Sequence, residues 1–365
     1  MKIDLIAGAR PNFMKIAPII DAIKEEIEKG ENISFRLIHT GQHYDKNMSD
    51  SFFEQLGMPQ PNLNLGSGGG TQAEQTAAIM IGYEKLLLTE KSDLCMVVGD
   101  VTSTMACAIV AQKLQIPVAH VEAGIRSGDW TMPEEINRLV TDSITNYFFT
   151  TTPEATRTIL NSGVSEDHVF WVGNTMIDTL LKQRPRFRKP NFWDDFKLKK
   201  SQYIVMTLHR PANVDEEDNL KKLLDEIVNN SQGLALIFPV HPRTAKILES
   251  IKIAYPQLHV IEPQGYLEFN YLVENALAVI TDSGGVTEET TVMGIPCMTL
   301  RDNTERPETV NVGTNELIGT NPKAIKPALD RLFAGEWKKG AIPELWDGDT
   351  AKRIVLILKD LNVAS

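Results

Sequence analysis

The sequence is poor in cysteine and has no long hydrophobic run. Its three cysteines, Cys95, Cys107 and Cys297, lie in apolar segments without CxxC spacing, which indicates structural thiols in a reducing compartment. No apolar stretch reaches the roughly 18 residues that a membrane-spanning helix needs. The N-terminal apolar run ends at Arg10-Pro11 without the small-residue cleavage site of a signal peptide. We therefore expect a cytoplasmic protein.

Basic charge is also in deficit. The chain has 48 Asp and Glu residues against 37 Lys and Arg residues, a formal net charge of -11 at pH 7. Such a balance argues against broad binding of nucleic acid or of anionic membranes, although a local basic cleft is compatible with it. We therefore expect neither a nucleic-acid partner nor a membrane partner.

Familiar ligand motifs are missing as well. No GxGxxG fingerprint follows the first strand candidate, and no GxxxxGK[ST] loop occurs. There is no cluster of cysteine and histidine with metal-ligand spacing, which argues against an essential metal, although carboxylates alone leave Mg²⁺ open.

What the sequence does contain is an alternation of short apolar runs and longer amphipathic stretches, the pattern of βα units around a parallel sheet. In the first half the strand candidates are KIDLIAG, SFRLIHT, LCMVVGD, PVAHVEA, NYFFTT and VFWVGN. Helical periodicity covers residues 11–28 and 71–90 between them.

The alternation stops at residues 182–202, a stretch rich in proline and basic residues that is typical of an interdomain linker. It restarts with YIVMTLH, LALIFPVH, LHVIEP, LAVITDSG, IPCMTL and ELIG, and residues 350–361 are a final helix candidate. We predict two successive α/β domains, residues 1–182 and 183–349. Ligands of such folds bind at the carboxyl ends of the strands, and the expected site is the cleft between the domains.

Carboxylates gather after one strand of the first half, in the segment HVEAGIRSGDWTMPEEINR. Glu122 lies at an apolar strand end, where a carboxylate is costly unless it is paired or protonated. Glu134 and Glu135 stand at a helix start, where acidic residues are favoured in any case, and Arg138 one turn later could pair with either. Glu122 is therefore harder to explain by local structure alone than Glu134 or Glu135.

Two other strand ends of the first half carry polar residues. Arg10 and Lys15 follow the first strand at the start of a helix, an arrangement that suits an anion, although an arginine capping a turn would look the same. Asp100 ends the strand LCMVVGD and is either a functional carboxylate or a simple helix N-cap.

The second half repeats the pattern with a different chemistry. His209 and Arg210 end its first strand, where a histidine is structural or is placed to bind phosphate or move a proton. Arg306 lies in LRDNTERPETV, which is either part of a polar network at a cleft mouth or a salt-bridged loop.

A glycine-containing turn follows another strand of the second half. Ser283, Gly284 and Gly285 lead into a helix whose first amides would face a phosphate, although a plain strand-to-helix turn is the alternative. Glu288 or Glu289 could then accept hydrogen bonds from a ribose. The order of these motifs predicts a nucleoside diphosphate on the second domain whose attached group reaches the carboxylates of the first.

These motifs resemble those of the non-hydrolysing UDP-N-acetylglucosamine 2-epimerases. The resemblance rests on GARPNFMKIAPI, HTGQHYD, VVGDVTSTMA, HVEAGIRSGD, PEEINR, VGNTMID, LHRPANVD, PVHPR, TDSGGVTEE and RDNTERPE, in this order over most of the chain. It implies the GT-B architecture of two Rossmann-like domains with doubly wound parallel sheets, and a C-terminal helix, residues 350–365, that packs back on the first domain. It also implies a homodimer.

The resemblance further implies an activity. UDP-GlcNAc and UDP-ManNAc would be interconverted by elimination of UDP to 2-acetamidoglucal and re-addition, without any cofactor. By resemblance the catalytic residues are Asp100, Glu122, Glu134 and His209. By resemblance the substrate-binding residues are Arg10, Lys15, Arg138, Ser283, Gly284, Gly285, Glu289 and Arg306.

The chain departs from the family pattern at one place. Gln42, His43 and His241 match part of a second UDP-GlcNAc site that activates many bacterial members. Residues 66–75, GSGGGTQAEQ, lack the basic residue of that site, so we expect no activation by substrate and interpret the glycines as a mobile flap over the cleft.

Four other functions fit parts of the pattern. One is epimerisation of another UDP-sugar, such as UDP-2,3-diacetamido-2,3-dideoxyglucuronate, which would want an extra cation near the sugar. The others are the hydrolysing branch, which releases free ManNAc, a GT-B glycosyltransferase, which would need an acceptor surface, and a non-catalytic nucleotide-sugar binder, which would not need the carboxylates and histidine together.

Overall fold

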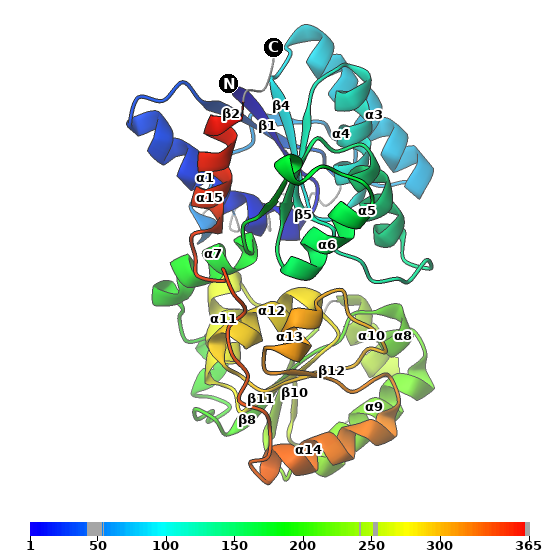
Figure 1. Ribbon diagram of the computed structural model, residues 1–365. Helices are drawn as coiled ribbons and strands as arrows, with labels where there is room; N and C mark the ends of the chain where they lie inside the picture. Colours follow the sequence, from blue (N-terminus) through cyan, green and yellow to red (C-terminus); the bar gives the residue numbers. More distant parts are fainter. Residues whose placement is uncertain (42–52, 54, 241, 251–254, 362–365) are drawn as a thin grey trace. The chain divides into compact units, whose positions relative to one another are not determined.

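The chain forms two compact units, each built on its own parallel sheet (Figure 1). The computed structural model describes residues 1–361 except 42–52, 54, 241 and 251–254. The first unit is Met1–Lys182 together with Glu344–Ser365, and the second is Gln183–Pro343. No described helix is long and apolar enough to cross a bilayer.

The sheet of the first unit has the strand order β3-β2-β1-β4-β5-β6-β7. Its strands are β1 (Lys2–Ala7), β2 (Ser34–His39), β3 (Leu63–Asn64), β4 (Leu94–Val98), β5 (Val118–Ala123), β6 (Tyr147–Thr150) and β7 (Val169–Trp171). Its helices are α1 (Arg10–Glu28), α3 (Gln72–Thr89), α4 (Thr102–Lys113), α5 (Pro133–Ser143), α6 (Pro153–Asn161), α7 (Thr175–Gln183) and α15 (Thr350–Asp360), with the 3-10 turn η1 (Glu166–His168). All six predicted strands of the first half are present, and the two-residue β3 is additional.

The chain order of this sheet reverses beside β1. Strand β1 pairs in parallel with β2 on one side and with β4 on the other. Such a reversal leaves a crevice at the carboxyl ends of the two central strands, where ligands of doubly wound sheets bind. Residues directly after β1 and β4 are therefore positioned for function.

The sheet of the second unit has the order β10-β9-β8-β11-β12-β13, which reverses in the same way between β8 and β11. Its strands are β8 (Tyr203–Thr207), β9 (Ala235–Pro239), β10 (Leu258–Ile261), β11 (Ala278–Thr281), β12 (Cys297–Thr299) and β13 (Asn315–Leu317). Its helices are α8 (Pro211–Val214), α9 (Glu217–Asn230), α10 (Pro242–Ser250), α11 (Tyr266–Asn275), α12 (Gly284–Met293), α13 (Pro307–Asn311) and α14 (Ile325–Phe333), with the turns η2 (Arg184–Arg186), η3 (Asn191–Trp193) and η4 (Pro322–Ala324).

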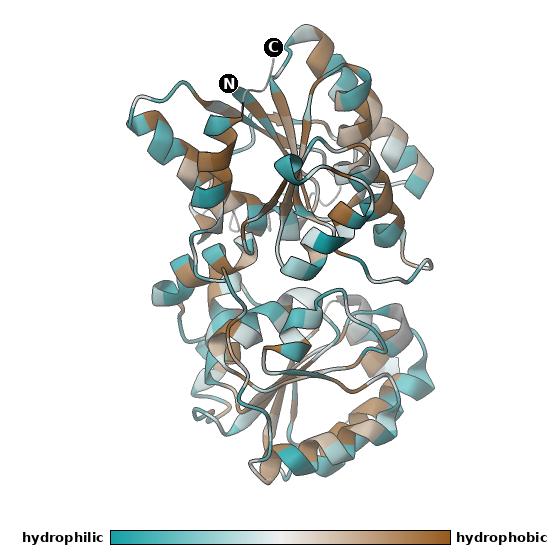
Figure 2. Ribbon diagram, viewed as in Figure 1, coloured by the Kyte–Doolittle hydropathy of each residue, from teal (hydrophilic) through white to brown (hydrophobic). Residues whose placement is uncertain are grey.

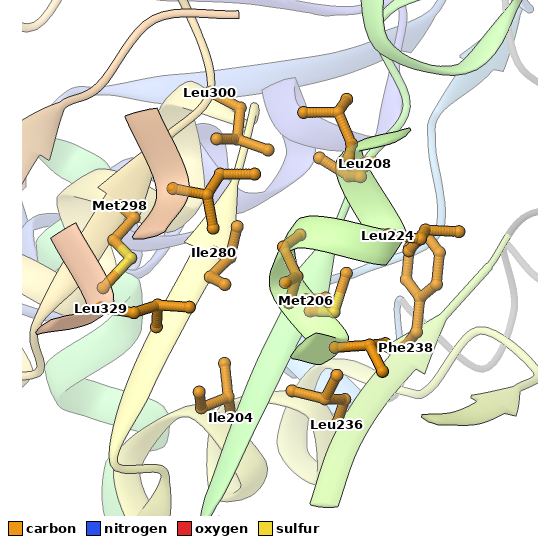
Figure 3. Close-up of a cluster of buried hydrophobic side chains, with 14 of the residues drawn as sticks. Ile204, Met206, Leu208, Leu224, Leu236, Phe238, Ile280, Met298, Leu300 and Leu329 are labelled. Carbon is orange, nitrogen blue, oxygen red and sulfur yellow. The ribbon is translucent and has the colours of Figure 1, made fainter. Parts of the chain in front are cut away.

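The strands of both sheets are almost wholly apolar because helices cover them, as Figure 2 shows in brown. In the second unit, Ile204 and Met206 of β8, Phe238 of β9 and Ile280 of β11 are fully buried in one cluster (Figure 3). This rigid packing fixes the strand ends that carry the polar residues of the site.

The segment predicted as a linker is instead part of the second unit. Its Trp193 ring lies edge-on to Tyr203 and Tyr271, with centroids 5.5 and 5.3 Å away. Phe192, Phe196 and Leu198 pack into the same hydrophobic cluster. The prediction was wrong because it rested on the proline and basic residues of the segment. The aromatic side chains among them are buried against β8 and α11.

The C-terminal helix α15 lies beside α1 in the first unit (Figure 1). The carboxylate of Asp178 accepts hydrogen bonds from the amides of Thr350 (3.2 Å) and Ala351 (2.7 Å), so it caps the start of the helix. Near its other end, Lys359 pairs with Glu26 of α1. Both ends of α15 are thereby attached to the first unit.

Candidate active site

Glu122 occupies a buried position at the carboxyl end of β5. It is 4% exposed, and its Oε2 lies 2.6 Å from Nζ of Lys15, which comes from α1. A carboxylate this deep needs a partner because burial penalises its charged form. Lys15, predicted as a ligand for substrate, therefore has a definite structural role beside Glu122.

The backbone at Glu122 is unusual. Its φ is 72°, in the left-handed region, and the pairing of β5 with β6 shifts register between Val121 and Ala123. A left-handed residue with a side chain costs about 1–2 kcal/mol, and such residues cluster at functional sites. Gly99, with φ 70°, comes so close that a Cβ there would lie 3.3 Å from Nζ of Lys15 and 3.8 Å from Oε2 of Glu122. The ends of β4 and β5 thus meet at this ion pair.

Asp100 directly follows Gly99 and pairs with Arg138 of α5. The side-chain amide of Asn137 donates to the backbone carbonyl of Asp100 at 2.8 Å. The N-cap of α4 is Val101, so the alternative that Asp100 is simply a cap is wrong. Asp100 is held by α5, at the reversal of the sheet.

The two neighbouring acids at the start of α5 have different surroundings. Glu135 is buried, accepts hydrogen bonds from the amides of Ser127 (2.9 Å) and Gly128 (3.1 Å), and pairs with Arg138 at 2.7 Å. Burial alone would raise its pKa, but these donors lower it below the ordinary value. Glu134 is half-buried and has no hydrogen-bond or ion-pair partner among the side chains that the structure describes. Of the pair, only Glu135 is engaged in holding the loop before α5.

The N-terminus of α1 is less suited to an anion than the sequence indicated. The amides of Gly8 and Ala9 donate to Oδ1 of Asn12 at 3.1 and 2.9 Å, and Lys15 is paired with Glu122. Arg10 is the first residue of the helix, and its side chain lies outside the described part of the structure. The predicted anion site therefore depends on Arg10 rather than on these amides.

In the second unit, His209 follows β8 and meets Asp282, which follows β11. Nδ1 of His209 lies 2.7 Å from Oδ1 of the fully buried Asp282, whereas the imidazole is 59% exposed. Asp282 also accepts hydrogen bonds from the amide of Arg210 (3.0 Å) and from Asn213 Nδ2 (3.0 Å). Burial would raise the pKa of Asp282, but His209 and these donors lower it. An ionised Asp282 orients the imidazole so that Nε2 faces outward.

Asp282 was not among the predicted residues. The signal was present, since an acid directly after the apolar run LAVIT is as costly as Glu122 unless it is paired. A plain strand-to-helix turn also explains the segment, so the sequence alone leaves the role of Asp282 open.

Ser283 is the N-cap of α12, and its side chain makes no capping hydrogen bond. Its own amide donates to Oγ1 of Thr281 at 3.0 Å. A Cβ on Gly284 would lie 2.9 Å from Oε1 of Glu305, so glycine is the residue that fits there. The first-turn amides of α12, including that of Gly285, are not used by a cap and suit a phosphate.

The two acids of α12 also differ. Glu288 pairs with Nε of Arg306 at 2.8 Å, so both belong to a buried ion pair. Asn270 donates a long hydrogen bond to Glu289 (3.5 Å), Tyr266 is a second donor beside it, and burial raises the pKa of Glu289 to about 7 despite both. Glu289, rather than Glu288, is therefore the candidate for accepting ribose hydrogen bonds.

The first half of the glycine-rich segment, residues 66–75, packs against the end of β2 and the residues that follow it. The amides of Leu65 and Ser67 donate to the carbonyls of His39 and Thr40, both at 2.8 Å. A Cβ on Gly68 would lie 2.5 Å from the carbonyl oxygen of Gly41, so glycine allows the backbones to pack closely. The flap interpretation is wrong for this half. Gln42, His43 and His241 lie outside the described residues.

The described residues hold no group of three or more His, Cys, Asp or Glu side chains that could bind an ion. The one pair with DxD spacing before α15, Asp347 and Asp349, pairs with Arg353 and Lys352.

Comparison with known proteins agrees with this geometry. Residues 25–359 match the family model of UDP-N-acetylglucosamine 2-epimerase. The chain is 42% identical to the "UDP-N-acetylglucosamine 2-epimerase" of Methanocaldococcus jannaschii, over 98% of this chain and 99% of that protein. It is 38% identical to the "UDP-2,3-diacetamido-2,3-dideoxy-D-glucuronate 2-epimerase" of Pseudomonas aeruginosa, over 87% of this chain and 88% of that protein.

A solved structure gives the same picture. The crystal structure of the Methanocaldococcus jannaschii UDP-GlcNAc 2-epimerase in complex with UDP-GlcNAc and UDP matches with a TM-score of 0.87 and 42% identity. The match covers 99% of this chain and 100% of that one. The GT-B architecture predicted from the motifs is therefore confirmed.

Proposed function

The chain belongs to the UDP-N-acetylglucosamine 2-epimerase family, and on that premise we propose that it interconverts UDP-GlcNAc and UDP-ManNAc without hydrolysis. The protein is an isomerase that inverts one carbon of a UDP-sugar. The observation that carries the proposal is the buried, left-handed Glu122 at the carboxyl end of β5, next to the strand end that bears Asp100.

The reaction follows from the chemistry of the substrate. A base removes the proton at C2, the C1–O bond breaks with its electron pair leaving on UDP, and C1 and C2 become doubly bonded in 2-acetamidoglucal. An acid then returns a proton to the opposite face of C2 while an oxygen of UDP re-forms the bond to C1. No electron is gained or lost, so no redox cofactor is required.

We assign Asp100, Glu122 and Glu134 to the sugar. Carboxylates stabilise the positive charge that develops when the anomeric bond breaks, and they are suitable proton donors and acceptors. Glu135 differs from these three acids because it accepts hydrogen bonds from the amides of Ser127 and Gly128 and so holds the loop before α5. Lys15 and Arg138 keep two of these carboxylates in place.

We assign the UDP moiety to the second unit. The hydroxyl of Ser283, the amides of Gly284 and Gly285 and the exposed imidazole of His209 suit the diphosphate. Arg10, in the first unit, is carried over as a diphosphate contact from the family resemblance alone. Glu289 suits the ribose hydroxyls. Arg306 acts through Glu288, its ion-pair partner.

Oligomeric state and location belong to the same proposal. Helix α3 exposes Ile81 (54%) and Leu88 (69%), an apolar surface that a second copy of the chain could cover in a homodimer. The three cysteines are buried free thiols, which supports the cytoplasm expected from the sequence.

Proton NMR of the protein with UDP-GlcNAc in D₂O tests the proposal directly. The expected result is a mixture of UDP-GlcNAc and UDP-ManNAc with deuterium at C2. Free ManNAc and UDP would place the protein in the hydrolysing branch. An unchanged spectrum would overturn the proposed substrate, and the diacetamido-glucuronate, suggested by the Pseudomonas aeruginosa relative, would be examined next.

A further inference from the structure

A buried histidine–aspartate pair lies beside the ends of β4 and β5 in the first unit. His120 of β5 is fully buried, with Nδ1 2.7 Å from Oδ1 of Asp142 and Nε2 2.8 Å from the carbonyl oxygen of Gly99. The other oxygen of Asp142 accepts hydrogen bonds from the amide of Gly124 (3.1 Å) and from Arg126 Nη1 (2.6 Å). None of these residues has a role in the proposed chemistry.

The protonation of the pair follows from its partners. The carbonyl of Gly99 can only accept, so Nε2 of His120 carries a hydrogen. Burial would raise the pKa of Asp142, but His120 and Arg126 lower it, so Asp142 is ionised. Asp142 stands at the last turn of α5, where the helix dipole disfavours an anion, and its contacts with Arg126 and His120 offset this.

The pair joins the backbone on both sides of the catalytic carboxylates. Gly99 directly precedes Asp100, and its amide donates to the carbonyl of Val121 at 3.0 Å. Gly124 lies two residues after Glu122. Gly99, Glu122 and Gly124 all have positive φ, 70°, 72° and 81°. A conformation of this kind persists only where surrounding contacts impose it.

We propose that His120 and Asp142 are positioning residues that hold the ends of β4 and β5, and thereby Asp100 and Glu122, in their reactive geometry. The proposal rests on the proposed epimerase function. Neither residue touches the substrate. Their loss should lower turnover through misplacement, by up to about 100-fold, because a shift of about 1 Å at reacting groups has such an effect.

The test uses three near-isosteric variants that weaken the pair and one variant, His120→Ala, that removes the imidazole. Asp142→Asn weakens both links of the carboxylate. His120→Gln keeps an amide near Nε2, His120→Asn keeps one near Nδ1, and His120→Ala keeps neither. We expect kcat for UDP-GlcNAc to fall about 100-fold in His120→Ala, with part of the loss restored by Gln or Asn. UDP affinity, measured by calorimetry, should change less than about twofold, because the second unit provides that site.

Asp4→Asn is the matched control. Asp4 is a fully buried carboxylate of the same sheet, bound by Nε and Nη2 of Arg36 at 2.8 Å each, and it is not part of the site. It should lower the melting temperature as Asp142→Asn does, yet keep kcat. A wild-type kcat in Asp142→Asn, or an equal loss of kcat in Asp4→Asn, would overturn the positioning role.

The outcomes also separate this inference from the proposed function. If the wild-type protein introduces no deuterium at C2, the proposed function fails and the positioning role fails with it. If the wild-type protein exchanges C2 and the four variants keep their kcat, the positioning role alone is wrong. Should His120→Ala not fold, the near-isosteric His120→Gln and Asp142→Asn decide the matter.

Discussion

Nζ of Lys15 lies 2.6 Å from Oε2 of Glu122, and both side chains are at most one-tenth exposed. The pair connects the first turns of α1 to the carboxyl end of β5. A charge pair at such depth is not a source of large net stability, because desolvation offsets most of the attraction. Its presence at a left-handed residue is better explained by function than by folding.

Removing the charge of Glu122 should stop the reaction while the fold survives. In Glu122→Gln, the amide can neither take nor return a proton at C2, and kcat should fall by about 10²–10⁴-fold. C2 deuterium exchange followed by NMR gives the rate, and circular dichroism checks the fold. Glu154→Gln, at an exposed ion pair with Arg157, serves as the control. Normal activity in Glu122→Gln would remove it from the mechanism.

Removing Lys15 should cost stability as well as activity. Lys15→Met leaves the buried carboxylate of Glu122 without its cation, which typically destabilises a protein by about 3–5 kcal/mol. Combining it with Glu122→Gln should restore much of the free energy of unfolding, measured in urea, but none of the activity. Lys182→Met breaks the exposed pair with Asp21 and should cost at most about 1 kcal/mol. Additive losses in the double variant would show that the pair is not coupled.

The proposed phosphate site at the start of α12 (Ser283, Gly284 and Gly285) predicts that Ser283 contributes to UDP affinity rather than to the stability of the fold. The hydroxyl of Ser283 makes no capping hydrogen bond, so Ser283→Ala should leave the melting temperature nearly unchanged. The dissociation constant of UDP should rise about tenfold, which corresponds to the loss of one hydrogen bond to a charged group. Calorimetry with UDP measures this constant, and kcat should fall less. An unchanged UDP affinity would contradict the proposed phosphate site.

The raised pKa of Glu289 predicts that the affinity for UDP depends on pH. Burial raises its pKa to about 7, and hydroxyl donors of the ribose favour the ionised form. The affinity for UDP should therefore rise with pH through about 7, by roughly tenfold between pH 6 and 8. Glu289→Gln cannot ionise and should lose this dependence. The titration of UDP itself is common to both proteins and cancels. Parallel pH profiles would show that Glu289 does not meet the ribose.

The departure of residues 66–75 from the family pattern predicts kinetics without activation by substrate. Without the basic residue of the activating site, the initial rate should follow a hyperbola in the concentration of UDP-GlcNAc. The rates are measured over a range from one-tenth to ten times KM, with and without a fixed amount of added UDP-GlcNAc in the UDP-ManNAc direction. A sigmoidal curve would mean that a second substrate site is built from other residues.

The local pattern of the sequence determined the elements and the fold class. Largely apolar segments of four to eight residues became strands, the periodic stretch at residues 71–90 became α3, and Thr71 with Glu74 formed the capping box at its start. These features depend on residues that are close in the chain, so the local sequence is enough to predict them. The order of motifs also placed Asp100, Glu122 and His209 at strand ends.

Only the tertiary structure decided which polar groups are committed and which are left for chemistry. Glu134 and Glu135 are equivalent in sequence, but the amides of Ser127 and Gly128, in the loop before α5, donate to Glu135 alone. The partner of His209 comes from a strand 73 residues away in sequence. Such pairs form because a parallel sheet brings distant strand ends together. Burial then makes each unpaired charge costly, so the packing of the whole domain selects the partners.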